Sequence, residues 1–451
     1  MSILISVLSI LITILFVIGT HEFGHFITAR LLNVKVLRFS IGFGKTLCKF
    51  YDKKGTEYVI ALIPLGGYVK MLGETEPSIE EKDLKYAFNR QPFYKKFLIL
   101  SAGPFTNILC AFLLYWLVYV VGFSIMKPVI GQVSPGSIAA KSGLQANQEI
   151  IGVDQRSLRS WMDVSINIIA HVGNQDHLIL ETKSLANQKK KTYILDLSNW
   201  RLDNLEPDPL RSLGIIPYEP FIPPVIGIIP PHSPAALSPL QVGDYILLIN
   251  HQPVKSWNDV VTIIRKNPDT LLAFTIKRQN KTMKILAQTS HKRDFLLQKS
   301  GFLNMGPQFV FPEDLLNKIK YSPLRAISPA FDEIVKFTYF NFILFGKLLT
   351  GKMSVQSLGG PITIFEGASN ALSLGFLSFI GFLAFLSMSV GIINILPIPG
   401  LDGGNLFIYL VEFIIRRPLP EKALFILYQS GLIIIFFLLF QALLNDVLRI
   451  F

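Results

Sequence analysis

Four segments of the chain are long enough and apolar enough to cross a lipid bilayer as helices. They cover residues 3–25, 97–123, 371–396 and 423–444. A helix needs about 20 residues to cross about 30 Å of hydrocarbon, and only a structure that satisfies its own backbone is stable there. Half of the sequence is hydrophobic. We therefore expect a polytopic α-helical membrane protein with four transmembrane helices and soluble parts between them.

The charges beside these segments predict their orientation. The first segment begins without lysine or arginine, whereas Arg30, Lys35 and Arg38 follow it. Basic residues favour the cytoplasmic side of a membrane. We therefore expect the N-terminus outside, residues 28–96 in the cytoplasm and residues 127–370 outside.

The large outer region contains a repeat. Ser160-Trp161 and Ser256-Trp257 are 96 residues apart, and the same offset aligns Asp163 with Asp259 without a gap. A fixed offset over some thirty residues is typical of two copies of one structural unit. Each copy has the pattern of a turn, a short helix and a β-rich run.

The second copy resembles a PDZ domain of membrane and periplasmic proteases. It reads Gly243-Asp244-Tyr245-Ile246-Leu247-Leu248-Ile249-Asn250 before Trp257, whereas the first copy has Asn147-Gln148 at the start of this run. The resemblance implies two extracytoplasmic α+β PDZ-like domains, at residues 127–220 and 221–312, each holding an extended peptide along a sheet edge. The alternative is that both copies are spacers without a ligand.

The rest of the chain divides around these copies. Residues 1–126 form an N-terminal membrane part, 313–370 an extracytoplasmic segment and 371–451 a C-terminal membrane part. Charged residues interrupt the apolar stretch 331–353, namely Asp332, Glu333, Lys336 and Lys347. We expect this stretch to be an amphipathic helix on the outer membrane surface.

A candidate metal site lies at the end of the first apolar segment, in the run His21-Glu22-Phe23-Gly24-His25. Residues four apart share one face of a helix, so His21 and His25 can bind one ion, and Glu22 can approach a water on that ion. Ionisable residues at membrane depth are costly and are usually functional. The pattern indicates zinc-dependent hydrolysis; the alternative is a polar helix end at the interface.

A hydrolytic zinc ion usually has three protein ligands, so one more is needed. Asp402 is the candidate, because the predicted topology places it on the same side of the bilayer as His25. It follows Pro397 and Pro399, which end the third segment. Proline removes a backbone donor, and such a break is tolerated at membrane depth only where it lines a cavity.

These motifs together resemble the site-2 protease family. The His-Glu-x-x-His helix, the later Asn-x-x-Pro-x-Pro-x-Leu-Asp-Gly stretch and the PDZ-like pair carry the resemblance, which covers nearly the whole chain. It implies that His21, His25 and Asp402 are zinc ligands, that Glu22 is the general base and that Asn394 positions the substrate or polarises its carbonyl.

The family resemblance also implies substrates and a location. The substrates would be single-span membrane proteins, such as a trimmed anti-sigma factor, and remnant signal peptides. The protein would be a multi-pass protein of the bacterial inner membrane, with periplasmic PDZ-like domains that exclude bulky substrates and an active site near the cytoplasmic side.

The cytoplasmic region contains a β-rich stretch at residues 57–71, with a proline and two glycines at its centre. We expect a hairpin around this Pro/Gly turn that re-enters the membrane toward the active site and clamps an extended substrate by main-chain hydrogen bonds. The alternative is an ordinary cytoplasmic hairpin. The candidate substrate-binding residues are Gly42, Gly44, Gly66, Gly67, Tyr68 and Val69.

Two other function classes stay open. A PDZ-based scaffold would have a vestigial metal site, and a metal transporter would need more intramembrane ligands than the spans offer. The net charge of +12 is spread over several regions, which gives no stripe for nucleic acid. Cys48 and Cys110 lie at different depths, so no disulfide is expected.

Overall fold

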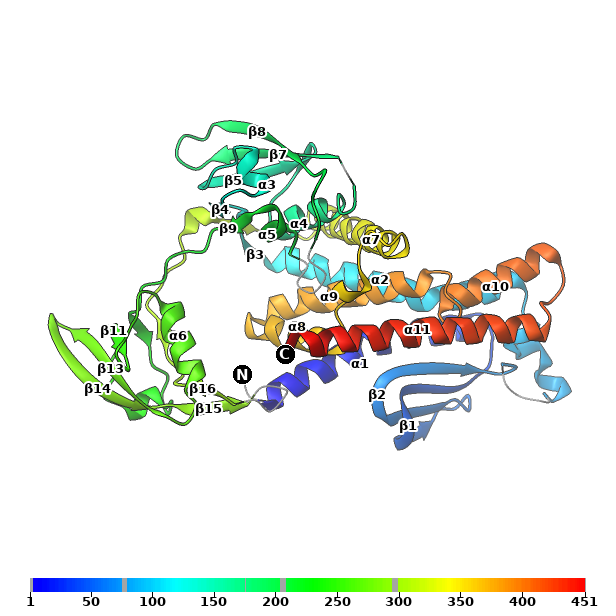
Figure 1. Ribbon diagram of the computed structural model, residues 1–451. Coiled ribbons are helices and arrows are strands. Elements are labelled where there is room, and N and C mark those ends of the chain that lie inside the picture. Colours follow the sequence, from blue (N-terminus) through cyan, green and yellow to red (C-terminus); the bar gives the residue numbers. More distant parts are fainter. Residues whose placement is uncertain (1–2, 75–78, 175, 203–207, 294–298, 451) are drawn as a thin grey trace. The chain divides into compact units, whose positions relative to one another are not determined.

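The computed structural model describes residues 3–74, 79–174, 176–202, 208–293 and 299–450 (Figure 1). The chain forms two compact units. One comprises Met1–Pro128, Val133–Ile216 and Asn317–Phe451, and the other comprises Val129–Gln132 and Pro217–Leu316.

The first unit contains the membrane helices. Its long helices are α1 (Ile3–Leu31), α2 (Phe93–Val121), α7 (Ile327–Leu349), α8 (Pro361–Ser373), α9 (Phe376–Ile395), α10 (Asp402–Ile415) and α11 (Glu421–Ile450). Among the described residues, four helical stretches are long and apolar enough to cross a membrane: Val7–Leu31, Phe93–Val121, Phe376–Ile395 and Glu421–Arg449. The prediction of a membrane protein with four such helices is confirmed.

The structure differs from the sequence prediction near the third span. The expected helix 371–396 is interrupted, since α8 ends at Ser373 and α9 begins at Phe376. Gly375 lies between them with φ of 120°, a conformation that glycine adopts without steric cost. A further helix, α10, begins at Asp402 and ends at Ile415.

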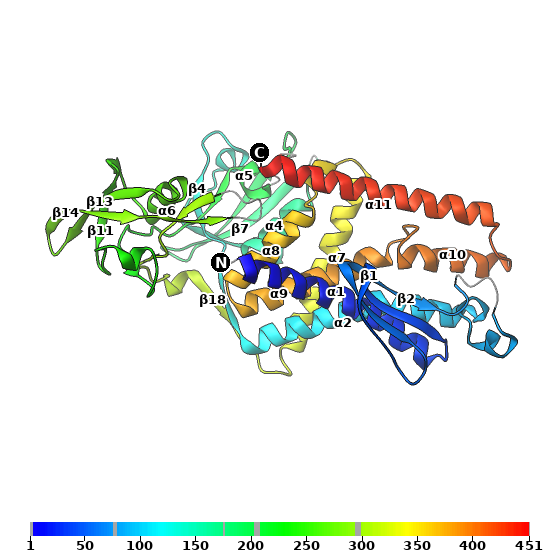
Figure 2. The ribbon, with the colours of Figure 1, turned by 90° about the horizontal axis from the view of Figure 1, so that it is seen from below.

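Helix α2 is the centre of the membrane part. It packs against α1, α7, α9 and α10, and α8 packs against α1 and α9 (Figures 1 and 2). One apolar cluster joins Tyr115 of α2, Phe337 of α7 and Met388 of α9. Much of α11 is exposed, as expected for a helix whose apolar side chains face lipid.

Strands β1 (Val36–Tyr51) and β2 (Glu57–Met71) form an antiparallel hairpin beside α1 (Figure 2). The hairpin turn between β1 and β2 lies at residues 52–56. The chain also reverses at the predicted Pro/Gly turn within β2, because residues 57–60 run parallel to residues 38–41 of β1 and residues 67–70 run antiparallel to them. Strand β1 reverses in the same way between residues 41 and 46. Gly42 and Gly44 have φ of 92° and 83° there, which favours glycine.

The first sheet domain also belongs to the first unit. It is a four-stranded antiparallel sheet in the order β6-β5-β7-β8. Its elements are α3 (Ile138–Lys141), β5 (Gln148–Val153), β6 (Arg156–Ser157), α4 (Trp161–Ile169), β7 (His177–Ser184), β8 (Lys190–Asp196) and α5 (Pro209–Leu213). Ile150, Val164 and Leu180 are fully buried in its core. Four short strands lie outside this sheet, namely β3 (Phe123–Met126), β4 (Ile130–Val133), β9 (Ile215–Pro217) and β18 (Leu316–Ile319).

The second sheet domain lies in the second unit and has the equivalent strand order, β12-β11-β13-β14. Its elements are β10 (Ile226–Ile228), β11 (Tyr245–Ile249), β12 (Gln252–Pro253), α6 (Trp257–Lys266), β13 (Leu271–Arg278), β14 (Lys281–Gln288), β15 (Ser290–Arg293), β16 (Lys299–Phe302) and β17 (Gly306–Pro307). Ile246, Val260 and Phe274 form its core. The two sheets thus follow the repeat, while the domain limits remain predictions.

Candidate metal centre

Three side chains that are far apart in the sequence meet at one point. His21 Nε2 lies 2.9 Å from Asp402 Oδ2, and His25 Nε2 lies 3.2 Å from the same oxygen. The two Nε2 atoms are 3.3 Å apart. All three side chains are mostly buried. The structure therefore brings together the three residues that were expected to bind zinc.

The spacing of these three atoms fits a tetrahedral zinc ion. With bonds of about 2.0–2.2 Å, two ligand atoms of such an ion are separated by about 3.3 Å. The three observed separations are close to this value. Two imidazole nitrogens and one carboxylate oxygen are also a donor set typical of a catalytic zinc site, in which a fourth position stays open.

His25 reaches this point because α1 and α2 approach each other closely. A Cβ atom added at Gly103 would lie 2.2 Å from His25 Nε2, and one added at Gly24 would lie 2.4 Å from the backbone oxygen of Ala102. His25 Nδ1 is 2.8 Å from the backbone oxygen of Ile99. With a proton on Nδ1, the ring donates this hydrogen bond and keeps the Nε2 lone pair for an ion.

Asp402 owes its position to the break after α9. The helix ends at Ile395, as the two prolines predict, and the chain turns before α10 begins at Asp402. The turn packs on α11, because a Cβ atom added at Gly431 would lie 1.8 Å from the backbone oxygen of Pro399.

Glu22 lies beside the centre and is 9% exposed. It faces the hairpin, since a Cβ atom added at Gly67 would lie 2.8 Å from Glu22 Cγ. The segment 67–71 of β2 pairs with residues 36–41 of β1, whose other side pairs with residues 57–60. In the described part of the chain, segment 67–71 is therefore an edge of the sheet, and it lies next to Glu22.

The other expected substrate residues lie along the same hairpin. Tyr68 pairs with Ser40 and stacks on the ring of Phe43, and its hydroxyl accepts a hydrogen bond from Arg38. Val69 pairs with Phe39 on the edge segment. Gly42, Gly44 and Gly66 lie where the hairpin bends.

Asn394 is less directly connected to the centre. Its Nδ2 atom donates a hydrogen bond to the backbone oxygen of Val390, 3.0 Å away and one turn earlier in α9. This contact satisfies a carbonyl near the end of the helix. A role in holding the substrate remains a prediction.

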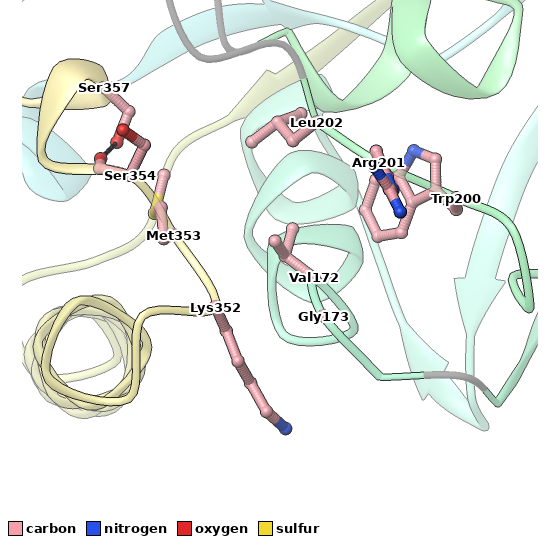
Figure 3. A pocket seen from close by; sticks show the side chains of 9 residues that line it. All are labelled: Val172, Gly173, Trp200, Arg201, Leu202, Lys352, Met353, Ser354 and Ser357. Carbon is pink, nitrogen blue, oxygen red and sulfur yellow. Dashed lines mark hydrogen bonds between the residues drawn. The ribbon is translucent and has the colours of Figure 1, made fainter.

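A separate cavity of about 290 Å³ lies far along the chain from these ligands (Figure 3). Trp200 and Arg201 lie on one side of it, and Met353 and Ser354 lie on the other. Among the described residues, no histidine, cysteine or carboxylate lines it. It therefore does not coincide with the metal centre, which is the one group of at least three such side chains in the described ranges whose ligand atoms are close enough to hold an ion.

Comparisons with known proteins identify the family of the chain. The sequence profile of peptidase family M50 matches residues 9–438. The "Regulator of sigma-E protease RseP" of Salmonella typhimurium (strain 14028s / SGSC 2262) is 36% identical over 451 residues, which is 100% of both chains. The protein of the same name from Escherichia coli (strain K12) is 36% identical over 434 residues, 96% of each chain.

A third relative carries a chemical description. The "Putative zinc metalloprotease" of Vibrio cholerae serotype O1 (strain ATCC 39315 / El Tor Inaba N16961) is 34% identical over 434 residues, again 96% of each chain. The family match covers almost the whole sequence, membrane helices and sheet domains included. The chain therefore belongs to peptidase family M50, the site-2 proteases, and is a membrane metalloprotease.

Proposed function

We propose that this protein is a zinc endopeptidase that cuts single-span membrane proteins within or beside the bilayer. The observation that carries the proposal is the meeting of Asp402 with His21 and His25, at separations that suit ligands of one zinc ion, on an apolar helix of membrane-spanning length that carries the two histidines. A water-soluble substrate would not require a metal centre in this position.

The residues of the site have separate roles in peptide hydrolysis. Bound zinc supplies Lewis acidity to the scissile carbonyl and to the attacking water. His21, His25 and Asp402 hold the ion. The carboxylate of Glu22 accepts a proton from the attacking water and then passes it to the leaving amine. Glu22 thus acts first as a general base and then as a general acid.

The hairpin supports the handling of a helical substrate. A transmembrane helix satisfies its own backbone groups, so it must be unwound before a peptide bond can be attacked. Segment 67–71 is an edge of the sheet beside Glu22, and an extended peptide can add to it as a further strand. Main-chain pairing of this kind selects little by side chain.

The proposed substrates and location of the protein follow from its family. The relatives from Salmonella and Escherichia coli are named as regulators of sigma-E, which supports an anti-sigma factor as a substrate class for this chain. Remnant signal peptides are the second class. We place the protein in the bacterial inner membrane, with the sheet domains acting as periplasmic PDZ-like filters and the metal centre near the cytoplasmic side.

The decisive experiment uses the purified full-length protein and a model single-span substrate. The wild-type protein should contain one zinc and cleave the substrate, a chelator should stop cleavage, and added zinc should restore it. Glu22→Gln should retain zinc and lose cleavage. Wild-type protein without metal, or cleavage by Glu22→Gln at the wild-type rate, would overturn the proposal.

A further inference from the structure

Asn107 is a fully buried amide that the proposed mechanism does not use. It lies in the middle of α2. Its Nδ2 atom is 3.3 Å from His21 Nδ1, and its Oδ1 atom is 2.8 Å from the hydroxyl of Thr20. Asn107 therefore contacts the ring nitrogen of His21 that points away from the metal centre.

The protonation of a metal-binding imidazole determines which atom of this contact donates the hydrogen bond and which accepts it. His21 directs Nε2 toward Asp402, so Nε2 is the atom available to an ion. A neutral imidazole that uses the Nε2 lone pair carries its proton on Nδ1. The Nδ1–H group is then a donor, and it requires an acceptor rather than the NH₂ group of an amide.

A half-turn of the Asn107 amide satisfies every group in this cluster. The oxygen and nitrogen of an amide occupy nearly equivalent positions, so the turn places Oδ1 against His21 Nδ1–H and Nδ2 against the Thr20 oxygen. Thr20 can accept this bond, because its own hydroxyl lies 2.9 Å from the backbone oxygen of Phe16 and donates there.

We infer that Asn107 is a positioning residue for the metal centre, and that its amide oxygen accepts the Nδ1–H of His21 in the zinc-loaded protein. The inference rests on the proposed zinc site. It also matches the other histidine, whose Nδ1 contacts the backbone oxygen of Ile99 on the same helix. Helix α2 would thus orient both rings from behind, one through its backbone and one through a side chain.

The surroundings hold Asn107 in place. Its backbone oxygen accepts a hydrogen bond from the hydroxyl of Ser387, 3.0 Å away on α9. A Cβ atom added at Gly391 would lie 3.2 Å from Asn107 Cβ, so α9 packs closely here. A side chain confined in this way can fix the direction of the His21 ring, which a mobile one could not.

The test compares zinc affinities of full-length variants by competition with a chelator. Asn107→Leu keeps the size of the side chain and removes the acceptor, and zinc binding should weaken by about 10–100-fold. Asn107→Asp keeps an acceptor facing Nδ1–H, and its affinity should stay within a few-fold of wild type. Ser389→Ala, the matched control, removes a buried hydroxyl of α9 that has no hydrogen-bond partner among the described residues, and it should bind zinc like wild type.

Each outcome separates this inference from the proposed function. If the wild type binds no zinc, or His21→Ala binds it equally well, the zinc site itself is wrong. If the wild type binds zinc and Asn107→Leu binds it as tightly, or if Leu and Asp weaken binding equally, the role of Asn107 is wrong and the zinc site stands.

A measurement on the wild type covers the case in which Asn107→Leu does not fold. In zinc-loaded protein with ¹⁵N-labelled histidine, solid-state NMR should show His21 protonated at Nδ1 and bound through Nε2. A His21 ring bound to the metal through Nδ1 would overturn the inference, because Asn107 would then have no proton to accept.

Discussion

Lys336 Nζ donates a hydrogen bond to Asp163 Oδ1 across 2.9 Å, and this contact joins α7 to α4 of the first sheet domain. Lys336 also pairs with Glu333 on its own helix, at 2.7 Å. Beside these charges, Ile166 of α4 is buried in the apolar cluster that α2, α7 and α9 share. The first sheet domain is therefore docked on the membrane part through α4.

The second copy of the repeat lacks this docking face. Asp259 corresponds to Asp163, and it accepts hydrogen bonds from the backbone of Lys255 and Ser256 at its own helix start. Thr262 takes the place of Ile166 and is exposed. The second copy therefore has no apolar side chain at the position equivalent to Ile166.

We predict that Lys336→Met loosens this docking. Asp163 would keep its charge while partly buried and lose its cationic partner, at a cost of about 1–2 kcal/mol. Hydrogen exchange at the amides of α4 should become faster, and the thermal midpoint should fall. Lys352→Met is the control, since Lys352 Nζ reaches Asn174 of the same domain through an exposed hydrogen bond. Equal effects of the two variants would contradict the docking role.

Acid should weaken the same contact. Burial alone would raise the pKa of Asp163, but the attraction of Lys336 and the hydrogen bonds from Lys336, Ser160 and the backbone of Arg159 together lower that pKa below its ordinary value. A carboxylate with a depressed pKa stabilises the fold fully above its unfolded pKa of about 3.9, and this stability is lost as the pH falls through the folded pKa.

The measurement is the thermal midpoint as a function of pH. Between pH 6 and pH 3 it should fall less steeply in Asp163→Asn than in the wild type, because the variant no longer binds a proton at this position on unfolding. The variant should also be less stable than the wild type near neutral pH. Parallel pH profiles would show that Asp163 does not contribute to the acid sensitivity.

Local patterns predicted much of this structure. The four spans are fixed by apolar length, and the pairing of His21 with His25 follows from the helical period. To predict that Asp402 lies beside them, only one further step was needed, namely that Asp402 and His25 are on the same side of the membrane. Each of these features depends on a few residues or on one topological choice.

Features that depend on packing were not predictable in the same way. The sequence around Gly375 is apolar throughout, so the break between α8 and α9 could not be predicted from hydrophobicity. The start of α10 could not be predicted from helix propensity, because Gly403 and Gly404 follow its first residue and glycine is a poor helix former. The contact of Asn107 with His21 gave no local signal. A buried asparagine in a predicted span is a weak sign of such a role, since it must find a partner.

A polar contact at the end of α11 should control the mobility of that helix. The carboxylate of Asp446 accepts hydrogen bonds from the backbone of Gly360 and Ile362 and from the hydroxyl of Thr363, at 2.6–2.9 Å. It thereby satisfies free N–H groups at the start of α8. Asp446→Ala removes this cap and should cost about 1–2 kcal/mol.

Hydrogen exchange at residues 360–364 provides the measurement, and it should be faster in Asp446→Ala. Gln441→Ala is the control, because within the described part of the chain the side chain of Gln441 donates its hydrogen bond to Asn445 of the same helix and not to α8. An unchanged exchange rate in Asp446→Ala would show that other contacts hold α11 against α8.

The close approach of α1 and α2 leads to a second prediction, which concerns zinc affinity. Gly103→Ala would place a methyl group on the His25 ring, 2.2 Å from Nε2, and the ring or the helix must move. A shift of this size breaks the ligand geometry, so zinc affinity should fall more than tenfold. Gly381→Ala in α9 is the control, because nothing lies within 4 Å of its added Cβ atom. Zinc affinity equal to that of wild type in Gly103→Ala would contradict the observed packing.

The edge segment of the hairpin can be tested with proline at Val69, which pairs with Phe39 of β1. Proline lacks the N–H group that a strand uses in pairing. Val69→Pro should cleave a single-span substrate at least tenfold more slowly while it keeps its zinc, because an extended substrate loses a main-chain bond to this edge. Val69→Ala keeps the N–H group and is the control, so it should cleave like wild type. If Val69→Pro retains full cleavage, the substrate does not pair with this edge; if it loses zinc, the hairpin supports the metal centre instead.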